Sequence, residues 1–157
     1  MAGHKEHHYT TTLSWRGSTS LGYEKYSRGH EMAAPPATAA LQMSSDPAFR
    51  GDPALLNPEQ LLVMAAASCQ MLSFLAVAAR KRVNVVEYDD QAEGFMPEDH
   101  KPVRITRILL KPRIVVETPA DPEALQKMVE LAHRECFISN SLKTQVDIEP
   151  QIMIIAL

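Results

Sequence analysis

The chain has 157 residues, of which 45% are hydrophobic, and this is the size and composition of one globular domain spanning residues 1–157. The net charge is -3 at pH 7 and the basic residues are scattered except at residues 80–82, which excludes the basic footprint of a nucleic-acid-binding protein; we expect neither DNA nor RNA as a partner. The first ten residues (MAGHKEHHYT) lack the apolar segment of a signal peptide, so we expect a cytoplasmic protein whose thiols are kept reduced.

The N-terminal third of the chain is predicted to form short strands and a long loop. Residues 8–15 alternate in the manner of a strand, and a second strand is predicted over residues 20–26. The polar stretch that carries Arg28 is predicted to be a turn or the end of a strand, and residues 38–43 a short edge strand. Residues 44–59 (SSDPAFRGDPALLNPE) are then expected to form a long ordered loop, and loops of that length are often functional.

Residues 57–82 are predicted to form one long and mostly apolar helix. Asn57 is a favourable N-cap, Pro58 suits the first helical position, and the basic residues 80–82 meet the negative end of the helix dipole. Apolar residues go all round this helix, so we expect it to be buried on most sides. The small residues 65–68 leave room for close packing of another backbone, and the expected partner is the same helix of a second subunit.

A transmembrane span is the rival interpretation of this helix. Four residues interrupt its apolar stretch: Ser68, Cys69, Gln70 and Ser73. Because both ends are also charged and no other segment resembles a membrane span, we expect no membrane association.

The remainder of the chain is predicted to contain three strands. Residues 83–96, 103–117 and 144–155 have strand-like composition, and Pro112 indicates a bulge or an edge in the second of them.

Two helices are predicted between the last two strands. The first begins at Pro122 with Asp121 as its N-cap and runs to about residue 133, and Cys136 lies at or just before the second, shorter one. Because helices and antiparallel-type strands come in blocks without regular βαβ alternation, the fold class is predicted to be α+β.

Cys69 in the long helix and Cys136 are the candidate functional residues. A single cysteine in an apolar helix is usually a small buried hydrophobic residue. Two features favour reactivity instead: Ser68 and Gln70 give Cys69 polar surroundings, and a helix N-terminus beside Cys136 is expected to lower the pKa of its thiol. In a reducing compartment the pair fits redox or nucleophilic chemistry, or two unrelated core thiols, better than a structural disulfide.

Other chemistries have weaker support from the sequence. There is no CxxC, HxxxH or HExxH pattern, and His4, His7 and His8 cluster at the N-terminus, so we expect no metal. A papain-like pair of Cys136 with His133 is the nucleophilic alternative, although a histidine at a helix C-terminus is ordinarily a surface cation. The chain has no GxGxxG or GxxxxGK pattern, so no nucleotide cofactor is expected.

Two separated motifs carry a family resemblance. The first is NPEQLLVMAAASC, residues 57–69, and the second is AHRECFISNSL, residues 132–142. Their order and spacing resemble the family of osmotically inducible protein C and organic hydroperoxide resistance protein (OsmC/Ohr), and the match runs from the opening HYTTTLSWRG to the end. Phe137 stands where proline often follows the second cysteine, and residues 28–52 match neither best-known branch closely. The resemblance implies antiparallel sheets wrapped around a long central helix, in an intertwined homodimer.

The resemblance also implies an activity, that of a cysteine-based thiol peroxidase in the oxidative stress response. Cys69 would attack the O–O bond of an organic hydroperoxide, and Cys136 would convert the resulting sulfenic acid into an intramolecular disulfide, which a dithiol reductant reopens. No cofactor is implied. In the family an arginine stabilises the thiolate and is held by the glutamate of the NPE motif, here Glu59. Arg28 is our first choice for this arginine and Arg50 the second.

Glu59 lies ten residues before Cys69 on the predicted helix, which separates them by about 15 Å. One side chain does not bridge that distance, so Glu59 is expected to serve the cysteine of the other subunit through the arginine. Without that role it is a dipole partner in the first turn of the helix.

The competing hypothesis is a non-catalytic protein of the same fold, which holds a hydrophobic ligand at the dimer interface while its cysteines are inert. For the enzyme, an apolar lining would favour an alkyl hydroperoxide over hydrogen peroxide. The residues expected to provide that lining are Met64, Met71, Leu72, Phe74 and Phe137.

Overall fold

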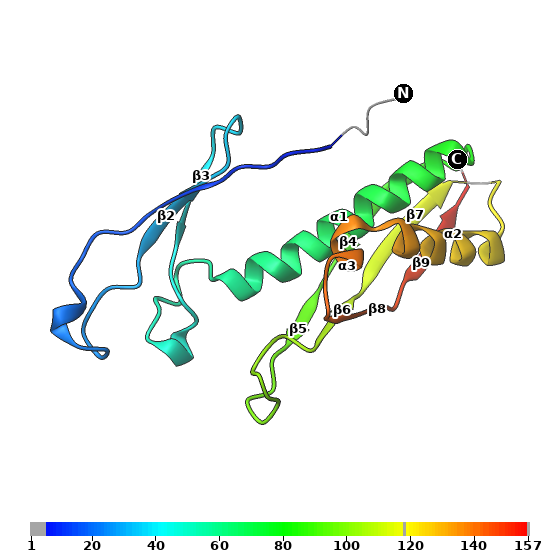
Figure 1. Ribbon diagram of the computed structural model, residues 1–157. Helices are drawn as coiled ribbons and strands as arrows, with labels where there is room; N and C mark the ends of the chain where they lie inside the picture. The colour runs from blue at the N-terminus through cyan, green and yellow to red at the C-terminus, as the bar shows by residue number, and fades with distance from the viewer. Residues whose placement is uncertain (1–5, 118, 157) are drawn as a thin grey trace. The chain divides into compact units, whose positions relative to one another are not determined.

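The computed structural model describes residues 6–117 and 119–156. It divides the chain into two compact units, Met1–Pro58 and Glu59–Leu157, which we call the N-terminal unit and the C-terminal unit. The elements follow one another along the chain (Figure 1) in the order β1 (Thr12–Ser14), η1 (Thr19–Leu21), β2 (His30–Ala33), β3 (Ala40–Met43), η2 (Pro47–Phe49), α1 (Pro58–Arg80), β4 (Val85–Asp90), β5 (Glu93–Phe95), β6 (Arg107–Leu110), β7 (Pro112–Glu117), α2 (Pro122–Glu135), α3 (Phe137–Asn140), β8 (Gln145–Ile148) and β9 (Gln151–Ile155).

The N-terminal unit contains a three-stranded antiparallel sheet in the order β1-β2-β3. Leu13 pairs with Met32, which in turn pairs with Leu41. The strand predicted over residues 38–43 is confirmed as β3, and it lies at an edge of the sheet as expected. The strand predicted over residues 8–15 is shorter, because only the three residues of β1 pair with β2.

The strand predicted over residues 20–26 is wrong. The chain forms the short 3-10 helix η1 there, whose N-cap Ser18 accepts a hydrogen bond from the amide of Ser20 (3.3 Å). Gly22 then adopts a φ of 84°, in the left-handed region that glycine reaches without strain. Local serine and glycine geometry therefore overrides the alternation that suggested a strand.

The loop predicted between residues 44 and 59 is ordered, as expected. Asp46 caps η2 at its N-terminus, and the hydroxyl of Ser44 accepts a hydrogen bond from the amide of Asp52 (3.0 Å). At Gly51 a Cβ atom would lie 1.6 Å from the carbonyl oxygen of Ser45, so the close approach of the two backbones requires glycine.

α1 begins and ends close to its predicted limits. At its C-terminus the Val83 amide donates a hydrogen bond to the Ala78 carbonyl (3.0 Å), and Arg82 adopts a left-handed φ of 59°. This arrangement, in which a left-handed residue lets the chain turn back onto the last turn, is a Schellman-type helix ending.

One face of α1 is open in the single chain, so its expected burial on most sides, which includes a second subunit, stays a prediction. Met64 is 53% exposed and Leu72 is 60% exposed, because the surrounding elements cover only one face. The buried residues of the helix are Ala66, Gln70, Phe74, Val77 and Ala78.

By length and composition, α1 is the one helix among residues 6–117 and 119–156 that could cross a membrane, a test that core helices of soluble proteins also pass. Its buried face packs against strands of the C-terminal unit in two hydrophobic clusters. One face of α1 therefore contributes to the hydrophobic core of the C-terminal unit.

The C-terminal unit contains two three-stranded sheets, in the orders β4-β7-β9 and β5-β6-β8. In each sheet one pair is antiparallel (β4 with β7, β5 with β6) and one is parallel (β7 with β9, β6 with β8). The α+β class is thus confirmed, and only the sheet of the N-terminal unit is wholly antiparallel among the three described.

Each of the three long strands predicted in this half is divided in two, because the chain passes from one sheet to the other at its middle. β4 precedes β5, β6 precedes β7 and β8 precedes β9, and the members of each pair belong to different sheets. Pro112 lies at such a switch, as the first residue of the central strand β7, so the expectation of an edge or a bulge there is wrong. The start of a strand tolerates proline because the missing N–H falls at the end of the ladder.

α2 is confirmed with the predicted cap, since the Asp121 side chain accepts a hydrogen bond from the Ala124 amide (3.0 Å) and Pro122 is the first helical residue. The helix packs beside α1 on the face of the first sheet that carries Ile114 and Val116. A second cluster joins the N-terminal half of α1 to β6, with Ile138 of α3 at its border. The two helices and α3 thereby bring the candidate residues of the C-terminal unit together.

Candidate functional site

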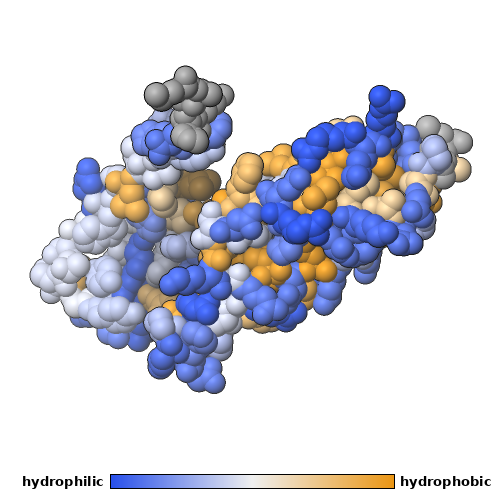
Figure 2. All heavy atoms as spheres, turned by 45° about the vertical axis from the view of Figure 1, so that its right-hand side comes forward, coloured by the Kyte–Doolittle hydropathy of each residue, from blue (hydrophilic) through white to orange (hydrophobic). Residues whose placement is uncertain are grey.

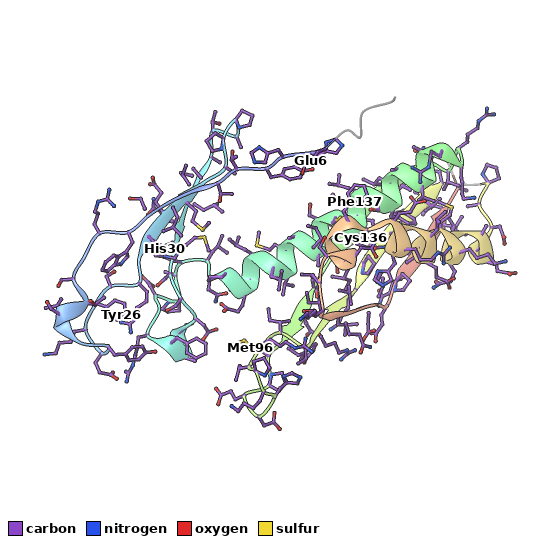
Figure 3. All side chains as sticks on the ribbon, viewed as in Figure 1. Glu6, Tyr26, His30, Met96, Cys136 and Phe137 are labelled. Atoms are coloured by element: carbon purple, nitrogen blue, oxygen red, sulfur yellow. The ribbon has the colours of Figure 1, made fainter. Side chains whose placement is uncertain are left out.

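The two cysteines come from different elements of the C-terminal unit. Cys69 lies near the middle of α1 and is partly buried, whereas Cys136 is 0% exposed at the junction of α2 and α3 (Figure 3). Both are free thiols, and Cys69 lies near enough to Cys136 to raise the pKa of its thiol. The structure therefore brings together two residues that are 67 positions apart in the sequence.

The Cys136 thiol is held in a protonated state by its surroundings. Burial raises the pKa of Cys136, hydrogen bonds from the hydroxyl and amide of Ser139 lower it in part, and the nearby Cys69 thiol raises it again. The Ser139 Oγ atom lies 3.3 Å from the Cys136 Sγ atom. The expectation that the adjacent helix would lower the pKa of Cys136 is wrong, because the pKa is raised overall. α3 has only four residues, and the effect of burial is larger than any effect of this helix end.

Gln70 and Phe74 follow Cys69 along α1 and are almost fully buried. The Gln70 amide donates to the Val129 carbonyl of α2 (3.4 Å). Phe74 packs against Tyr88 of β4, with ring centroids 6.0 Å apart. Phe74 therefore belongs to the core, and its predicted role in an apolar lining for substrate is wrong.

Two further ionisable side chains, Tyr88 and Asp90, lie on β4, and the first of them interacts with Cys136. Burial raises the pKa of Tyr88 well above its usual range, with smaller contributions from the nearby Asp90 and Cys136. Burial also raises the pKa of Asp90, against the opposing effect of amide hydrogen bonds from Lys111 and Gln91. In both side chains burial thus disfavours the charged form.

His133 does not join the cysteine pair as a papain-like base. Its carbonyl accepts a hydrogen bond from the Cys136 amide (3.2 Å), but the charge of its ring acts on Asp147, whose pKa is lowered chiefly by a hydrogen bond from Arg107. The described partners of the Cys136 thiol are Ser139 and Cys69.

In the N-terminal unit, Arg28 is enclosed by aromatic side chains. Its guanidinium donates to the carbonyls of Tyr26 (2.5 Å) and Tyr23, and its Cζ atom lies 3.8 Å from the Tyr26 ring centroid and 4.7 Å from that of Tyr23. Among the residues that the structure describes, cation–π contacts and carbonyl acceptors hold this cation without an ion pair to a carboxylate. The side chain borders a hollow of about 360 Å³ within the unit. The residues that line the hollow are Trp15, Thr19, Tyr26, Ser27, Arg28, His30, Ser44, Ser45 and Pro58.

Arg50 has a different environment from Arg28. It forms an ion pair with Glu24 in which both side chains are more than half exposed. An exposed ion pair of this kind contributes little to stability and leaves Arg50 a surface cation.

Glu59 lies in the first turn of α1, ten residues before Cys69 on the same helix. The rise of an α-helix therefore separates the two by about 15 Å, as expected. The assignment of Glu59 to the arginine and the cysteine stays a prediction.

Two neighbours of Cys136 were not predicted from the sequence: Ser139 and Tyr88. Ser139 had a detectable signal, because it is the third residue of the predicted short helix and Cys136 directly precedes that helix, which is the spacing of a capping interaction. Tyr88 gave no such signal, because its proximity to Cys136 depends on how β4 and α2 pack.

Among the described residues, no group of three or more histidine, cysteine or acidic side chains is placed to hold a metal ion. His4, one of the three clustered histidines, lies outside the described residues.

The C-terminal unit is thus an α+β fold in which a long helix packs on two mixed sheets and carries one of two free thiols. A family model described as OsmC-like protein matches residues 51–151, and the chain belongs to this family. The family predicted from the two motifs is thereby confirmed.

Solved structures agree with this assignment. An OsmC-like protein of unknown function from Vibrio cholerae is 30% identical, with a TM-score of 0.84 over 93% of this chain and 100% of that one. An organic hydroperoxide resistance protein OsmC from Legionella pneumophila is 17% identical, with a TM-score of 0.63 over 94% of this chain and 98% of that one.

A putative organic hydroperoxide resistance protein from Vibrio cholerae, with captopril bound in one of its active sites, is 18% identical, with a TM-score of 0.64 over 97% of this chain and 95% of that one. The two more distant structures share the fold with this chain. No curated protein matches it.

Proposed function

We propose that the protein is a cytoplasmic thiol peroxidase that reduces organic hydroperoxides to alcohols at the expense of a dithiol reductant. The observation that carries this proposal is the adjacency of two free thiols, Cys69 and Cys136, from separate elements of an OsmC-like fold. Structural neighbours named as organic hydroperoxide resistance proteins support the choice of substrate class.

The difference in exposure supports the roles of the two cysteines. Cys69 is partly exposed, and its thiolate would attack the terminal oxygen of the hydroperoxide. The S–O bond of a sulfenic acid forms, the O–O bond breaks, and the departing alkoxide takes up a proton to become the alcohol. Cys136 is 0% exposed and is therefore shielded from peroxide, but it adjoins Cys69 and would convert the sulfenic acid into a disulfide. No cofactor is required for either step.

An apolar surface near the cysteines supports an organic rather than an inorganic hydroperoxide. Met64 and Leu72 are exposed on α1, and Phe137, next to Cys136, is 80% exposed. Figure 2 shows hydrophobic atoms gathered on one face of the C-terminal unit. Alkyl groups gain by contact with such a surface, whereas hydrogen peroxide has no apolar group to bury.

The same surface supports a homodimer, since soluble monomers rarely leave large apolar patches open. In that assembly Glu59 of one subunit would hold Arg28, which would stabilise the Cys69 thiolate of the other subunit. Arg28 is favoured over Arg50 because it is enclosed by rings and carbonyls, whereas Arg50 is engaged with an exposed glutamate.

Counting free thiols before and after one equivalent of cumene hydroperoxide tests the proposal. We expect the count to fall from two free thiols per chain to none. The mass of the chain should fall by two hydrogens and by nothing else, as an intramolecular disulfide requires. Two unreactive thiols would contradict the enzyme and favour the alternative, a non-catalytic protein that holds a hydrophobic ligand.

A further inference from the structure

We propose that Ser139 is a positioning residue for disulfide formation: its hydroxyl donates to the Cys136 sulfur and thereby sets the rate at which Cys136 attacks the oxidised Cys69. This inference rests on the proposed function and deepens it, because it names the residue that controls the second chemical step.

The local backbone fixes the two groups relative to each other. Cys136 is the N-cap of α3, and Ser139 is the third residue of that helix, so its side chain folds back over the cap. The Asn140 amide donates to the Cys136 carbonyl (3.0 Å), and the Asn140 side chain donates to the Arg134 carbonyl (2.9 Å). These bonds close the turn that holds the Ser139 Oγ atom 3.3 Å from the sulfur.

Burial makes this hydrogen bond important for the reaction. Cys136 is 0% exposed, so water cannot solvate its thiolate, and burial raises the pKa of Cys136. Hydrogen bonds to the Cys136 sulfur must therefore come from the protein, and Ser139 provides two donors, its hydroxyl and its amide. Burial also raises the pKa of the neighbouring Tyr88, so its phenol adds no charge that would replace this effect.

The step itself is balanced without a further oxidant. Cys136 first gives up its proton, and its thiolate electron pair then attacks the sulfur of the Cys69 sulfenic acid. The S–S bond forms, the S–O bond breaks, and the departing hydroxide takes up a proton and leaves as water. The hydrogen bond from Ser139 stabilises the thiolate before the attack and is released as the S–S bond forms.

This role has a distinctive pH signature. Loss of a hydrogen bond to a charged sulfur should reduce the thiolate fraction of Cys136 about tenfold at neutral pH. A more basic thiolate is also a better nucleophile, by about threefold for that change. Ser139→Ala should therefore slow disulfide formation about threefold at neutral pH but accelerate it about threefold at a pH where the thiol is fully ionised in both proteins. Mere misplacement of Cys136 would slow the step at every pH.

Single-turnover kinetics on the full chain measure this change from slower to faster disulfide formation as the pH rises. The protein is mixed with one equivalent of cumene hydroperoxide at several pH values, and sulfenic acid formation and disulfide formation are followed separately. Ser139→Thr, which retains the hydroxyl, should restore the wild-type profile. Ser141→Ala is the matched control, because the Ser141 hydroxyl donates to the Phe137 carbonyl (2.7 Å) in the same turn. Its rate of disulfide formation should equal that of wild type at every pH. A parallel slowing of Ser139→Ala at every pH, or a profile like that of wild type, would overturn the inference.

A second measurement separates this inference from the proposed function. In a Cys69→Ser background, titration of the Cys136 thiolate by ultraviolet absorbance does not depend on peroxide, and Ser139→Ala should move its midpoint upward by about one pH unit. If wild type forms no sulfenic acid, the proposed function fails while this titration still tests the hydrogen bond. An unchanged midpoint together with normal sulfenic acid formation overturns the role of Ser139 alone.

Discussion

The side chain of Gln70 crosses from α1 to α2, where its Nε2 atom donates to the Val129 carbonyl at 3.4 Å. Gln70 is the residue after Cys69, and it is 1% exposed. Its Oε1 atom is buried without a partner among the described residues. The contact ties the helix that carries Cys69 to the helix that leads into Cys136, and it leaves one buried acceptor unsatisfied.

We expect Gln70→Met to change the free energy of unfolding by less than about 1.5 kcal/mol, because a side chain of similar length fills the same space and the unsatisfied oxygen is removed. Gln70→Ala should lose about 2–5 kcal/mol, because it leaves a cavity between the two helices. Urea unfolding of both variants measures the difference. Equal losses would show that the bond to Val129, rather than the filled volume, is what stabilises the contact.

Asp90→Asn should stabilise the protein at neutral pH by up to about 1 kcal/mol, a value reduced for partial exposure. One carboxylate oxygen of Asp90 accepts a hydrogen bond from the Lys111 amide (2.7 Å), and the side-chain oxygen of an asparagine would accept the same bond. The other oxygen of Asp90 is buried without a partner in the described part of the chain. Because burial raises the pKa of Asp90 above 3.8, the folded state binds this proton more tightly than the unfolded state. The penalty of the charge is therefore fully present above the folded-state pKa and absent below the unfolded one.

Unfolding of the wild type and of Asp90→Asn at about pH 7 and about pH 3 measures this window, and the gain should disappear at the lower pH. A gain of the same size at both values would show that the charge is not its cause.

Much of the fold follows from local signals in the sequence. The limits of α1 and the cap of α2 at Asp121 were predictable because each is set by residues within one turn of the helix end. The paired cysteines were predictable from the family motifs, and the structure places them close together. In contrast, each long apolar stretch of the C-terminal half is divided between two sheets, and the hydrophobic pattern of one strand does not say where the chain changes sheet.

The site was less predictable than the fold, because its environment is made by packing. The position of Phe74 on α1 gives no indication of whether it faces a substrate or the core, and only its contact with Tyr88 settles that it is core. The net direction of the pKa of Cys136 likewise depends on burial, which outweighs the local helix end. The exposed face of α1 was also not predictable. Apolar residues lie on all sides of this helix, so the sequence does not show which side the rest of the chain leaves uncovered.

The proposed roles of the cysteines predict different defects in the two serine variants. Cys69→Ser should abolish peroxide reduction, because no other thiol is placed to attack. Cys136→Ser should consume one equivalent of organic hydroperoxide and stop as a sulfenic acid. Peroxide consumption, with dimedone labelling of the sulfenic acid, distinguishes the two, and equal residual turnover would contradict the assignment.

The open face of α1 predicts a homodimer that persists at micromolar concentration. Leu72 is 60% exposed in the single chain, so Leu72→Asp should halve the mass measured by light scattering without unfolding the subunit. Val86→Asp is the matched control, because Val86 is 43% exposed on β4 at a break in strand register and should leave the mass unchanged. A monomeric wild type would contradict the prediction directly.

The last prediction concerns the arginine that activates the thiolate. The Arg28 guanidinium is held by two carbonyls and lies against two tyrosine rings, whereas Arg50 is paired with Glu24 at the surface. A cation that is not already neutralised by a carboxylate is the better partner for a thiolate. We therefore expect Arg28→Ala to lower the rate of Cys69 alkylation by iodoacetamide at neutral pH about tenfold, which corresponds to about 1.4 kcal/mol of lost thiolate stabilisation.

Measurements in the Cys136→Ser background report on Cys69 alone, and Arg50→Ala is the control that removes an equal charge. Glu59→Ala should show a smaller defect than Arg28→Ala, because the carboxylate would only orient the guanidinium. Arg28→Lys should recover part of the rate at most, since an ammonium group keeps the charge but loses the planar contacts with Tyr23 and Tyr26. A slowed Arg50→Ala beside a normal Arg28→Ala would reverse the choice of arginine, and normal rates in both would leave backbone dipoles as the source of thiolate stabilisation.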